Sequence, residues 1–340
     1  MRLFKYISIF IILCGLFFYF ETRQDNYVVL SGKTMGTYYN IKIRTKIKHN
    51  MLNKKVQEEL ELINQQMSVF DNSSELSLIN QNIQNEWQPL SPEMSEVMKK
   101  AYDVYLKSNG SFDPTVGKLV DLWGFGAGTP KNKPSEEEIK KVLAYTGFNK
   151  VKFKDNFTRL KKTQPDIYIN LSAIAKGYGV QRIAEMLSEI GYKDFVVEIG
   201  GEVVARGRRD ELTDGWNVAV SKPTAEGVET AFVVTLKNSA VATSGDYRNF
   251  FIIDNKRYSH TISPKTGYPS QHNIASATVF HKNCTLADAY ATALMEMGEN
   301  KALEFANQNG LSVILFIRDT NDNIKTLISN EAEKLIEAQQ

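Results

Sequence analysis

Apolar positions follow two different spacings along this chain, and one stretch contains both. Between Ile167 and Leu171 apolar residues alternate with polar ones, as in a half-buried strand, and from Ala173 to Ile190 the spacing is helical. We therefore expect a strand, a polar turn and a helix with Lys176 in its first turn. Such a turn directs unpaired backbone N–H groups and positive charge at a ligand, which suits a phosphate. The alternative is a plain turn in which Ser172 is the N-cap and Lys176 is solvated.

The same spacings predict most of the remaining helices and strands. Helices are expected at residues 54–70, 91–110 (with Ser91 as N-cap and Pro92 at the first position), 136–145 (capped by Ser135) and 301–307. Strands are expected at residues 27–30, 35–43, 151–154, 194–199, 216–220, 231–236, 240–243, 311–317 and 324–329, with a turn at 31–33. The strand at 194–199 follows the helix at the spacing of a βαβ-like unit, and Gly200 and Gly201 then allow a ligand close to the backbone.

Composition indicates a globular protein of ordinary enzyme size. The 340 residues are 42% hydrophobic and 24% charged, which allows a large core in one domain or in two tightly packed ones. A net charge of +2 gives no reason to expect nucleic acid, and no basic run alternates with aromatic residues. Of the two cysteines, Cys14 lies in the apolar N-terminus and Cys284 is alone in the body, so no disulfide framework is expected.

The N-terminus resembles a targeting or anchoring segment. Arg2 and Lys5 precede an apolar run over residues 6–20, so export is expected. No small-x-small cleavage site follows the run, and an uncleaved anchor is favoured over a lipidated Cys14. The body would then face an extracytoplasmic space.

Two loop-like segments carry candidate ligand contacts. Residues 110–126 are rich in glycine, aromatic and short polar residues, so Phe112 and Trp123 could stack on a flat ring and Asp113 could accept hydrogen bonds. The alternative is a loop whose aromatic residues fill the core. His260 lies at the edge of a Pro/Gly-rich loop and is a candidate base or ligand, or an inert surface histidine.

A second helix pattern, over residues 284–297, carries a candidate cation site. Asp288 and Thr292 are four residues apart, so on a helix they share one face, and the alanines between them leave room for a ligand. Two oxygen donors at this spacing suit a hard cation such as Mg²⁺. The alternative is a capping box in which Thr285 is the N-cap and Asp288 lies at the third helical position.

Taken together, seven segments resemble one known family. They are 33–38 (KTMGTY), 112–117 with 122–126 (FDPTVG and LWGFG), 171–178 (LSAIAKGY), 198–201 (EIGG), 243–248 (TSGDYR), 259–264 (SHTISP) and 287–292 (ADAYAT). In this order they resemble the ApbE family, which comprises bacterial FAD:protein FMN transferases that are usually membrane-anchored and face outward. The resemblance extends from about residue 28 to 330.

The resemblance implies a fold, a reaction and a location. It implies an α+β fold with a T-fold-like core, in which mixed or antiparallel sheets pack against helices after an N-terminal membrane segment, so that residues 1–22 form the anchor and 23–340 the flavin transferase domain. It implies that Mg²⁺ is required and that FMN moves from FAD to a threonine or serine hydroxyl, forming a phosphoester and releasing AMP. The implied acceptors are exported subunits of flavin-dependent membrane electron-transfer complexes, reached from the inner membrane with the body in the periplasm.

The resemblance also implies roles for individual residues. Its FAD contacts fall on Met35, Phe70, Ser111, Phe112, Asp113, Asn170, Lys176 and Ile262. Its metal ligands fall on the backbone oxygen of Ala173 and on the side chains of Asp288 and Thr292. His260 falls on the histidine that assists the acceptor hydroxyl, and Lys176 would neutralise charge on the diphosphate. Asn170 stands where the family often has Asp, and an amide can neither act as a base nor accept charge-assisted hydrogen bonds.

Two alternative functions stay open from the sequence. In the first, water replaces the acceptor hydroxyl, and the protein is a Mg²⁺-dependent FAD pyrophosphatase that yields FMN and AMP. In the second, it is a flavin-binding lipoprotein without catalysis. The intact set of Lys176, His260, Asp288 and Thr292 argues against the second alternative.

Overall fold

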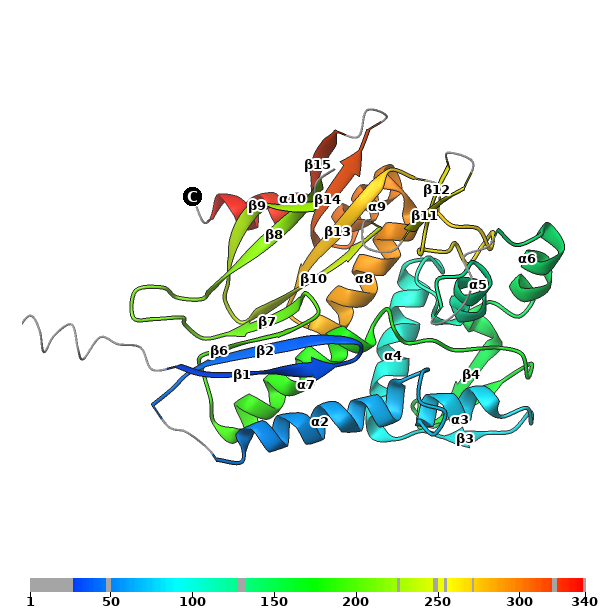
Figure 1. The fold of residues 1–340 in the computed structure, drawn as a ribbon, viewed down its shortest axis with the longest axis horizontal. Coiled ribbons are helices and arrows are strands. Elements are labelled where there is room, and N and C mark those ends of the chain that lie inside the picture. Colours follow the sequence, from blue (N-terminus) through cyan, green and yellow to red (C-terminus); the bar gives the residue numbers. More distant parts are fainter. Residues whose placement is uncertain are drawn as a thin grey trace, which may run out of the picture.

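The structure, a computed structural model, describes residues 27–46, 50–126, 133–224, 227–246, 250–253, 256–270, 272–319 and 323–338. Its largest element is an eight-stranded sheet with the order β1-β2-β6-β7-β10-β13-β14-β15, in which every neighbouring pair is antiparallel (Figure 1). The strands are β1 (Tyr27–Thr34), β2 (Thr37–Arg44), β6 (Phe195–Ile199), β7 (Glu202–Arg206), β10 (Ser239–Gly245), β13 (Ile274–His281), β14 (Ser312–Arg318) and β15 (Ile324–Ile328).

Both faces of this sheet are covered. Alternate residues of β14 show the division, because Val313 and Leu315 join the cluster formed with the helices whereas Ile314 and Phe316 join a cluster on the other face. The first face is covered by α2 (Leu52–Met67), α7 (Ala175–Ile190), α8 (Cys284–Met297) and α9 (Glu299–Gln308). The second is covered by the hairpin of β8 (Trp216–Thr224) and β9 (Gly227–Leu236) and by α10 (Asn330–Glu337).

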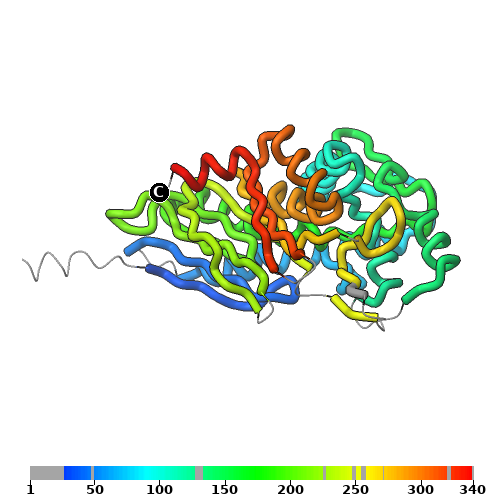
Figure 2. The backbone as a smooth tube through the Cα atoms, turned by 90° about the horizontal axis from the view of Figure 1, so that it is seen from above, coloured from blue at the N-terminus to red at the C-terminus, as the bar shows by residue number. Residues whose placement is uncertain are grey.

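A smaller helical part lies beside the sheet, as Figures 1 and 2 both show. It contains α3 (Glu75–Gln81), α4 (Pro92–Lys107), α5 (Gly117–Leu122), α6 (Glu136–Leu143), two short 3₁₀ turns (Pro114–Val116 and Phe148–Lys150) and a small sheet of β3 (Gln88–Pro89), β5 (Arg159–Lys162) and β4 (Val151–Lys154). The hairpin of β11 (Phe250–Ile253) and β12 (Lys256–Ser259) packs against this part through its aromatic residues.

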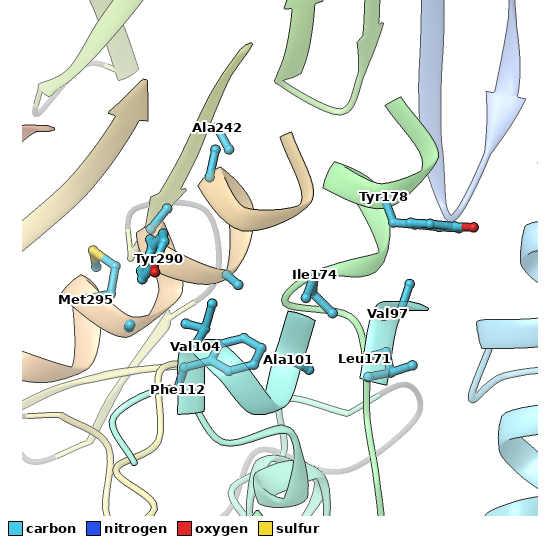
Figure 3. Packing of buried hydrophobic residues seen from close by; sticks show 14 of the residues in the cluster. Val97, Ala101, Val104, Phe112, Leu171, Ile174, Tyr178, Ala242, Tyr290 and Met295 are labelled. Atoms are coloured by element: carbon cyan, nitrogen blue, oxygen red, sulfur yellow. The ribbon is translucent and has the colours of Figure 1, made fainter. Parts of the chain in front are cut away.

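The two parts share one hydrophobic core. Figure 3 shows Val97 and Val104 of α4 facing Ile174, at the start of α7, and Tyr290 of α8. Burying each such side chain stabilises the fold by about 1.5–3 kcal/mol. Because the site residues lie on these same helices, the core also fixes where the site residues lie.

The predicted α+β class is confirmed, and so are several helix starts. Ser91 caps α4 by accepting from the N–H of Met94, and Pro92 occupies the first turn. Ser135 begins α6 with a capping box that involves Glu138.

The predicted strand at residues 167–171 is wrong. Ile167, Ile169 and Leu171 are buried as expected, but the segment joins no sheet. The side chain of Asn80 pairs with both backbone groups of Ile169, at 2.8 Å each, and so replaces a neighbouring strand. The expected βαβ-like unit is therefore also wrong, since the strand after α7 enters an antiparallel sheet.

The predicted turn at residues 31–33 is wrong as well. β1 and β2 stay paired up to Thr34 and Thr37, and the chain reverses at Met35 and Gly36. Both turn residues have positive φ, 48° and 71°, as the tight hairpin turns that match strand twist require.

The predicted membrane segment, residues 1–22, lies outside the described residues. Within the described ranges, no helix has the length and apolar character needed to span a bilayer.

Candidate active site

A cavity of about 380 Å³ lies where the sheet, α7, α8 and the smaller helical part meet. Residues from six segments of the chain line it: Ser111–Asp113, Pro114, Val116, Gly117 and Val120; Asn170, Ser172, Ala173 and Lys176; Gly200 and Glu202; Thr243–Gly245; His260–Ile262; and Asp288, Thr292, Met295 and Glu296. Apart from Met35, Phe70, Trp123 and Gly201, all the residues predicted for the site are in this set. Segments far apart in sequence therefore meet around one space.

The first turn of α7 is capped from another helix. Ile174 at the N-cap position makes no side-chain cap, so the backbone N–H groups of the first turn need other partners. The N–H of Gly177 donates to Asp288 Oδ2 at 2.9 Å. The alternative in which Ser172 is the N-cap is therefore wrong, and the carboxylate of α8 is fixed against the positive end of α7.

Lys176 points into the cavity between two carboxylates. Its Nζ lies 2.9 Å from Glu202 Oε1 and 3.9 Å from Asp288 Oδ1. Burial by itself lowers the pKa of Lys176, but the charges of Asp288 and Glu202 outweigh it and hold that pKa above its ordinary value. Lys176 is therefore paired with carboxylates at the cavity wall, with 31% of its side-chain surface exposed, and it carries a positive charge there.

Glu202 is buried, with 2% of its surface exposed. Burial raises the pKa of Glu202 to about 7, against the favourable charge of Lys176. Its Oε1 accepts from Lys176, whereas its Oε2 has no hydrogen-bond partner among the residues that the structure describes. A buried carboxylate oxygen in this state is costly, and such groups concentrate at functional sites.

The start of α8 excludes the capping-box alternative for Asp288. The N-cap of α8 is Asn283, which accepts from the N–H of Leu286, so Thr285 is already inside the helix. Asp288 and Thr292 lie on one face, as predicted, and both line the cavity. Thr292 Oγ1 lies 3.2 Å from Ser244 Oγ on β10.

The donors at this point fit a hard cation. Asp288 has one oxygen held by Gly177 and the other directed toward Lys176, and the hydroxyl of Thr292 lies one turn further along α8. No group of three His, Cys, Asp or Glu side chains able to hold a metal occurs within the described ranges. A cation here would therefore need neutral oxygens beside Asp288, which Thr292 and the carbonyl of Ala173 could supply.

Asp113 serves the fold as well as the cavity wall. Its carboxylate accepts from the N–H and hydroxyl of Thr115, at 2.8 and 2.6 Å, and from the N–H of Phe148 at 3.0 Å. Burial raises the pKa of Asp113, while these hydrogen bonds favour its charged form. Phe112 reaches the cavity from the core, but Trp123 does not line it and is fully buried, donating to Gly267 O. For Trp123 the space-filling interpretation is the correct one.

Asn170 forms a tight local turn at the cavity wall. Its Oδ1 accepts from the N–H of Ser172 at 2.9 Å, and its own N–H donates to Pro114 O at 2.7 Å. The side chain thus shapes the backbone that leads to Ala173.

His260 follows β12 and lines the cavity. Its ring meets Phe125 edge to face, with centroids 6.3 Å apart. Ile262, two residues further on, is buried in the same wall. A histidine in this position can accept a proton from a ligand bound between it and Lys176.

Two predicted FAD contacts lie outside this cavity. Met35 forms the β1–β2 turn, and its side chain packs against α7 beside Gly179. Phe70, in the loop after α2, is 72% exposed. Their contact with FAD stays a prediction.

Sequence reasoning missed several lining residues, above all Glu202, Ser244 and Glu296. Glu202 follows the Gly200–Gly201 turn, where a glutamate is ordinarily solvated, so the sequence carried no signal for its burial. Glu296 lies four residues beyond Thr292, so it continues the face that carries Asp288.

Fold and site together define an α+β protein with a lysine paired to two buried carboxylates in one cleft suited to a phosphorylated ligand. Comparison with known sequences identifies the group, because the sequence model of the ApbE family matches residues 35–315. The chain belongs to the ApbE family, as its motifs predicted.

Relatives with the name FAD:protein FMN transferase match nearly the whole chain. A protein of Haemophilus influenzae named FAD:protein FMN transferase is 39% identical over 327 residues, which cover 94% of each chain. The solved structure of the flavin transferase ApbE from Vibrio cholerae has a TM-score of 0.85 at 36% identity and covers 92% of this chain and 99% of that one. The apo flavinyl transferase ApbE of Pseudomonas stutzeri has a TM-score of 0.84 at 31% identity, over 92% and 97%. The predicted transferase class is thereby confirmed.

Proposed function

We propose that this protein transfers FMN from FAD to a threonine or serine hydroxyl of an exported protein. The reaction would depend on Mg²⁺, form a phosphoester and release AMP. The observation that carries the proposal is the convergence of Lys176, Asp288, Thr292 and His260 on one cavity. Relatives at 39% and 33% identity that carry the name FAD:protein FMN transferase support the same reaction.

The residues that line the cavity divide the chemistry. Lys176 offsets the negative charge of the diphosphate, and the backbone at the start of α7 adds positive potential beside it. His260, from another segment of the lining, takes the proton of the acceptor hydroxyl as its oxygen bonds to the phosphorus of the FMN half. The bond from that phosphorus to the AMP oxygen breaks, and AMP leaves with the electron pair. A Mg²⁺ ion held by Asp288, Thr292 and the Ala173 carbonyl would neutralise further charge on the diphosphate.

The proposal extends to location on the basis of the sequence. The basic and apolar residues 1–20 support an inner-membrane anchor with the body in the periplasm. Exported subunits of flavin-dependent membrane electron-transfer complexes would then be accessible acceptors.

Incubation with FAD, Mg²⁺ and a candidate acceptor domain tests the reaction. We expect a fluorescent acceptor band, a mass increase of one FMN unit and an equal amount of AMP, all lost with EDTA or when the acceptor hydroxyl is removed. Free FMN and AMP without labelling of the acceptor would instead establish the FAD pyrophosphatase. If no FAD is converted, flavin binding without catalysis is the remaining alternative.

Variants assign the roles within that assay. His260→Ala should lower the transfer rate by about 10²–10⁴-fold, the usual contribution of a general base. Asp288→Ala should abolish the Mg²⁺-dependent transfer of FMN. Asp214→Ala is a matched control, because Asp214 is exposed and paired with Lys237 away from the cavity, and it should retain full activity. Equal activity of all three variants would refute the assignment.

A further inference from the structure

Among the carboxylates that line the cavity, Glu202 is buried, pairs with Lys176 and has no task in the proposed reaction. It begins β7, directly after the Gly200–Gly201 turn, where both glycines have positive φ, 63° and 112°. An added Cβ at Gly200 would lie 3.4 Å from Cδ of Lys176, so the turn lies directly against the lysine stem. The backbone thereby places Glu202 where it meets the end of the Lys176 side chain.

A single ammonium lies between two carboxylates here. Lys176 Nζ is in hydrogen-bond contact with Glu202 Oε1, at 2.9 Å, but is 1.0 Å further from Asp288 Oδ1, at 3.9 Å. Asp288 cannot turn away, because its Oδ2 is held by the N–H of Gly177. The ammonium of Lys176 can therefore pair closely with Glu202 or with Asp288, and in this structure it pairs with Glu202.

The two possible positions of the ammonium have opposite consequences for a cation. If Lys176 paired closely with Asp288, it would neutralise the carboxylate that lies one turn before Thr292 on α8, and a divalent ion would have to displace it. When Glu202 holds Lys176, Asp288 Oδ1 can bind the cation, and the ammonium stays in the cavity where it can bind a phosphate.

We propose that Glu202 is a positioning residue that retains Lys176 and thereby keeps Asp288 free to bind a divalent cation. The inference rests on the proposed function for the presence of the cation, and it adds the residue that prevents internal competition for Asp288. It predicts an energetic coupling between Glu202 and Lys176 that acts on metal binding even when FAD and acceptor are absent.

Metal binding in a double-mutant cycle tests this coupling. Mn²⁺ binding to the full chain, without FAD, is measured by electron paramagnetic resonance at pH 8 for the wild type, Glu202→Gln, Lys176→Met and the double variant. Glu202→Gln should weaken Mn²⁺ binding by about tenfold or more in the wild-type background, because Lys176 then moves onto Asp288. In the Lys176→Met background the same change should cost about threefold or less, the part due to loss of one nearby charge.

Each outcome decides one point. A cost that is equal in both backgrounds overturns the inference, because Glu202 would then act on the cation directly as a ligand or as a charge. A wild type that fails to bind Mn²⁺ overturns the cation site of the proposed function itself, and this inference with it. A coupled loss in Glu202→Gln together with normal FMN transfer at saturating Mg²⁺ supports the inference.

Two further variants are controls for a change in folding. Glu198→Gln removes a carboxylate from the same hairpin outside the cavity, and it should leave Mn²⁺ affinity unchanged. Glu202→Asp keeps the charge but withdraws it by one methylene from Lys176, so a smaller loss of affinity in the same direction is expected. If Glu202→Gln does not fold, as judged by thermal unfolding, the same cycle is run with Glu202→Asp, and an uncoupled loss refutes the inference.

Discussion

The contact between α7 and α8 predicts that a single methyl group will damage the site more than the fold. Gly177 lies where these helices cross, and a Cβ added there would lie 2.5 Å from Cys284 O and 2.6 Å from Asp288 Cβ. Both distances are roughly 1 Å below an ordinary van der Waals contact. Neither atom is the end of a flexible side chain, so Gly177→Ala must push the helices apart.

The expected cost in stability is small. Overpacking costs about 1–3 kcal/mol, and replacing glycine by alanine inside a helix returns about 1 kcal/mol. The net loss in the free energy of unfolding is therefore at most about 2 kcal/mol. The expected cost in activity is larger, because Gly177 N–H holds Asp288, and a displacement of about 1 Å at a reacting group can lower the rate about 10²-fold.

The assay combines urea unfolding with the rate of FMN transfer at saturating FAD and Mg²⁺. Gly179→Ala is the matched control on the same helix, because its nearest atoms, Met35 Cε at 2.9 Å and Ile199 Cδ1 at 3.4 Å, are flexible ends that can move. It should change stability by less than about 1 kcal/mol and retain most of the activity. Gly177→Ala with wild-type activity would refute the argument that this contact positions Asp288.

Three further predictions follow from buried polar groups. Asn80→Ala should destabilise the protein by about 2–4 kcal/mol in urea unfolding, because it leaves both backbone groups of Ile169 unpaired; a loss below about 0.5 kcal/mol would contradict this. Asp113→Ala should cost about 2–4 kcal/mol, since three donors lose their acceptor, and Asp113→Asn, which keeps one acceptor oxygen, should cost less; equal losses would show that the hydrogen bonds are not responsible. Burial raises the pKa of Glu202 from 4.5 to about 7, so its contribution to stability is fully present below pH 4.5 and is lost as the pH rises through 7, by roughly 3 kcal/mol. The raised pKa of Lys176 changes nothing in this window, because its contribution is lost only above its unfolded value of 10.5. The free energy of unfolding of the wild type should therefore be lower at pH 8 than at pH 5, and this difference should be smaller in Glu202→Gln. Equal differences in the two proteins would exclude Glu202 as the cause.

Sequence periodicity predicted those elements whose burial is decided locally. Helices α4, α7 and α8 follow from apolar spacing and from capping residues such as Ser91. The segment 167–171 has the burial of a strand without its hydrogen bonds, because a side chain more than 80 residues earlier, that of Asn80, took the place of a neighbouring strand. Periodicity reports burial, and it cannot say which group will satisfy the backbone.

The site needed a different kind of information. Lys176 and Asp288 are more than 100 residues apart, so spacing alone could not bring them together, and only the resemblance to the ApbE family did. Neither the spacing of residues nor the family resemblance indicated Glu202 as a site residue. A glutamate after a two-glycine turn is ordinarily solvated, and its burial becomes visible only when α7 packs against β7 and places Lys176 beside it.

The departure at Asn170 is explained by the role that its side chain has in the structure. Its Oδ1 accepts from the N–H of Ser172 and so closes the turn that leads to Ala173. This bond needs an acceptor oxygen two residues before a backbone N–H, and an amide provides it as well as a carboxylate does. A negative charge at this point would add repulsion toward a bound diphosphate without improving the turn. Asn170 is therefore compatible with the proposed transfer, in which His260 is the proposed base, as a residue that shapes the backbone leading to Ala173.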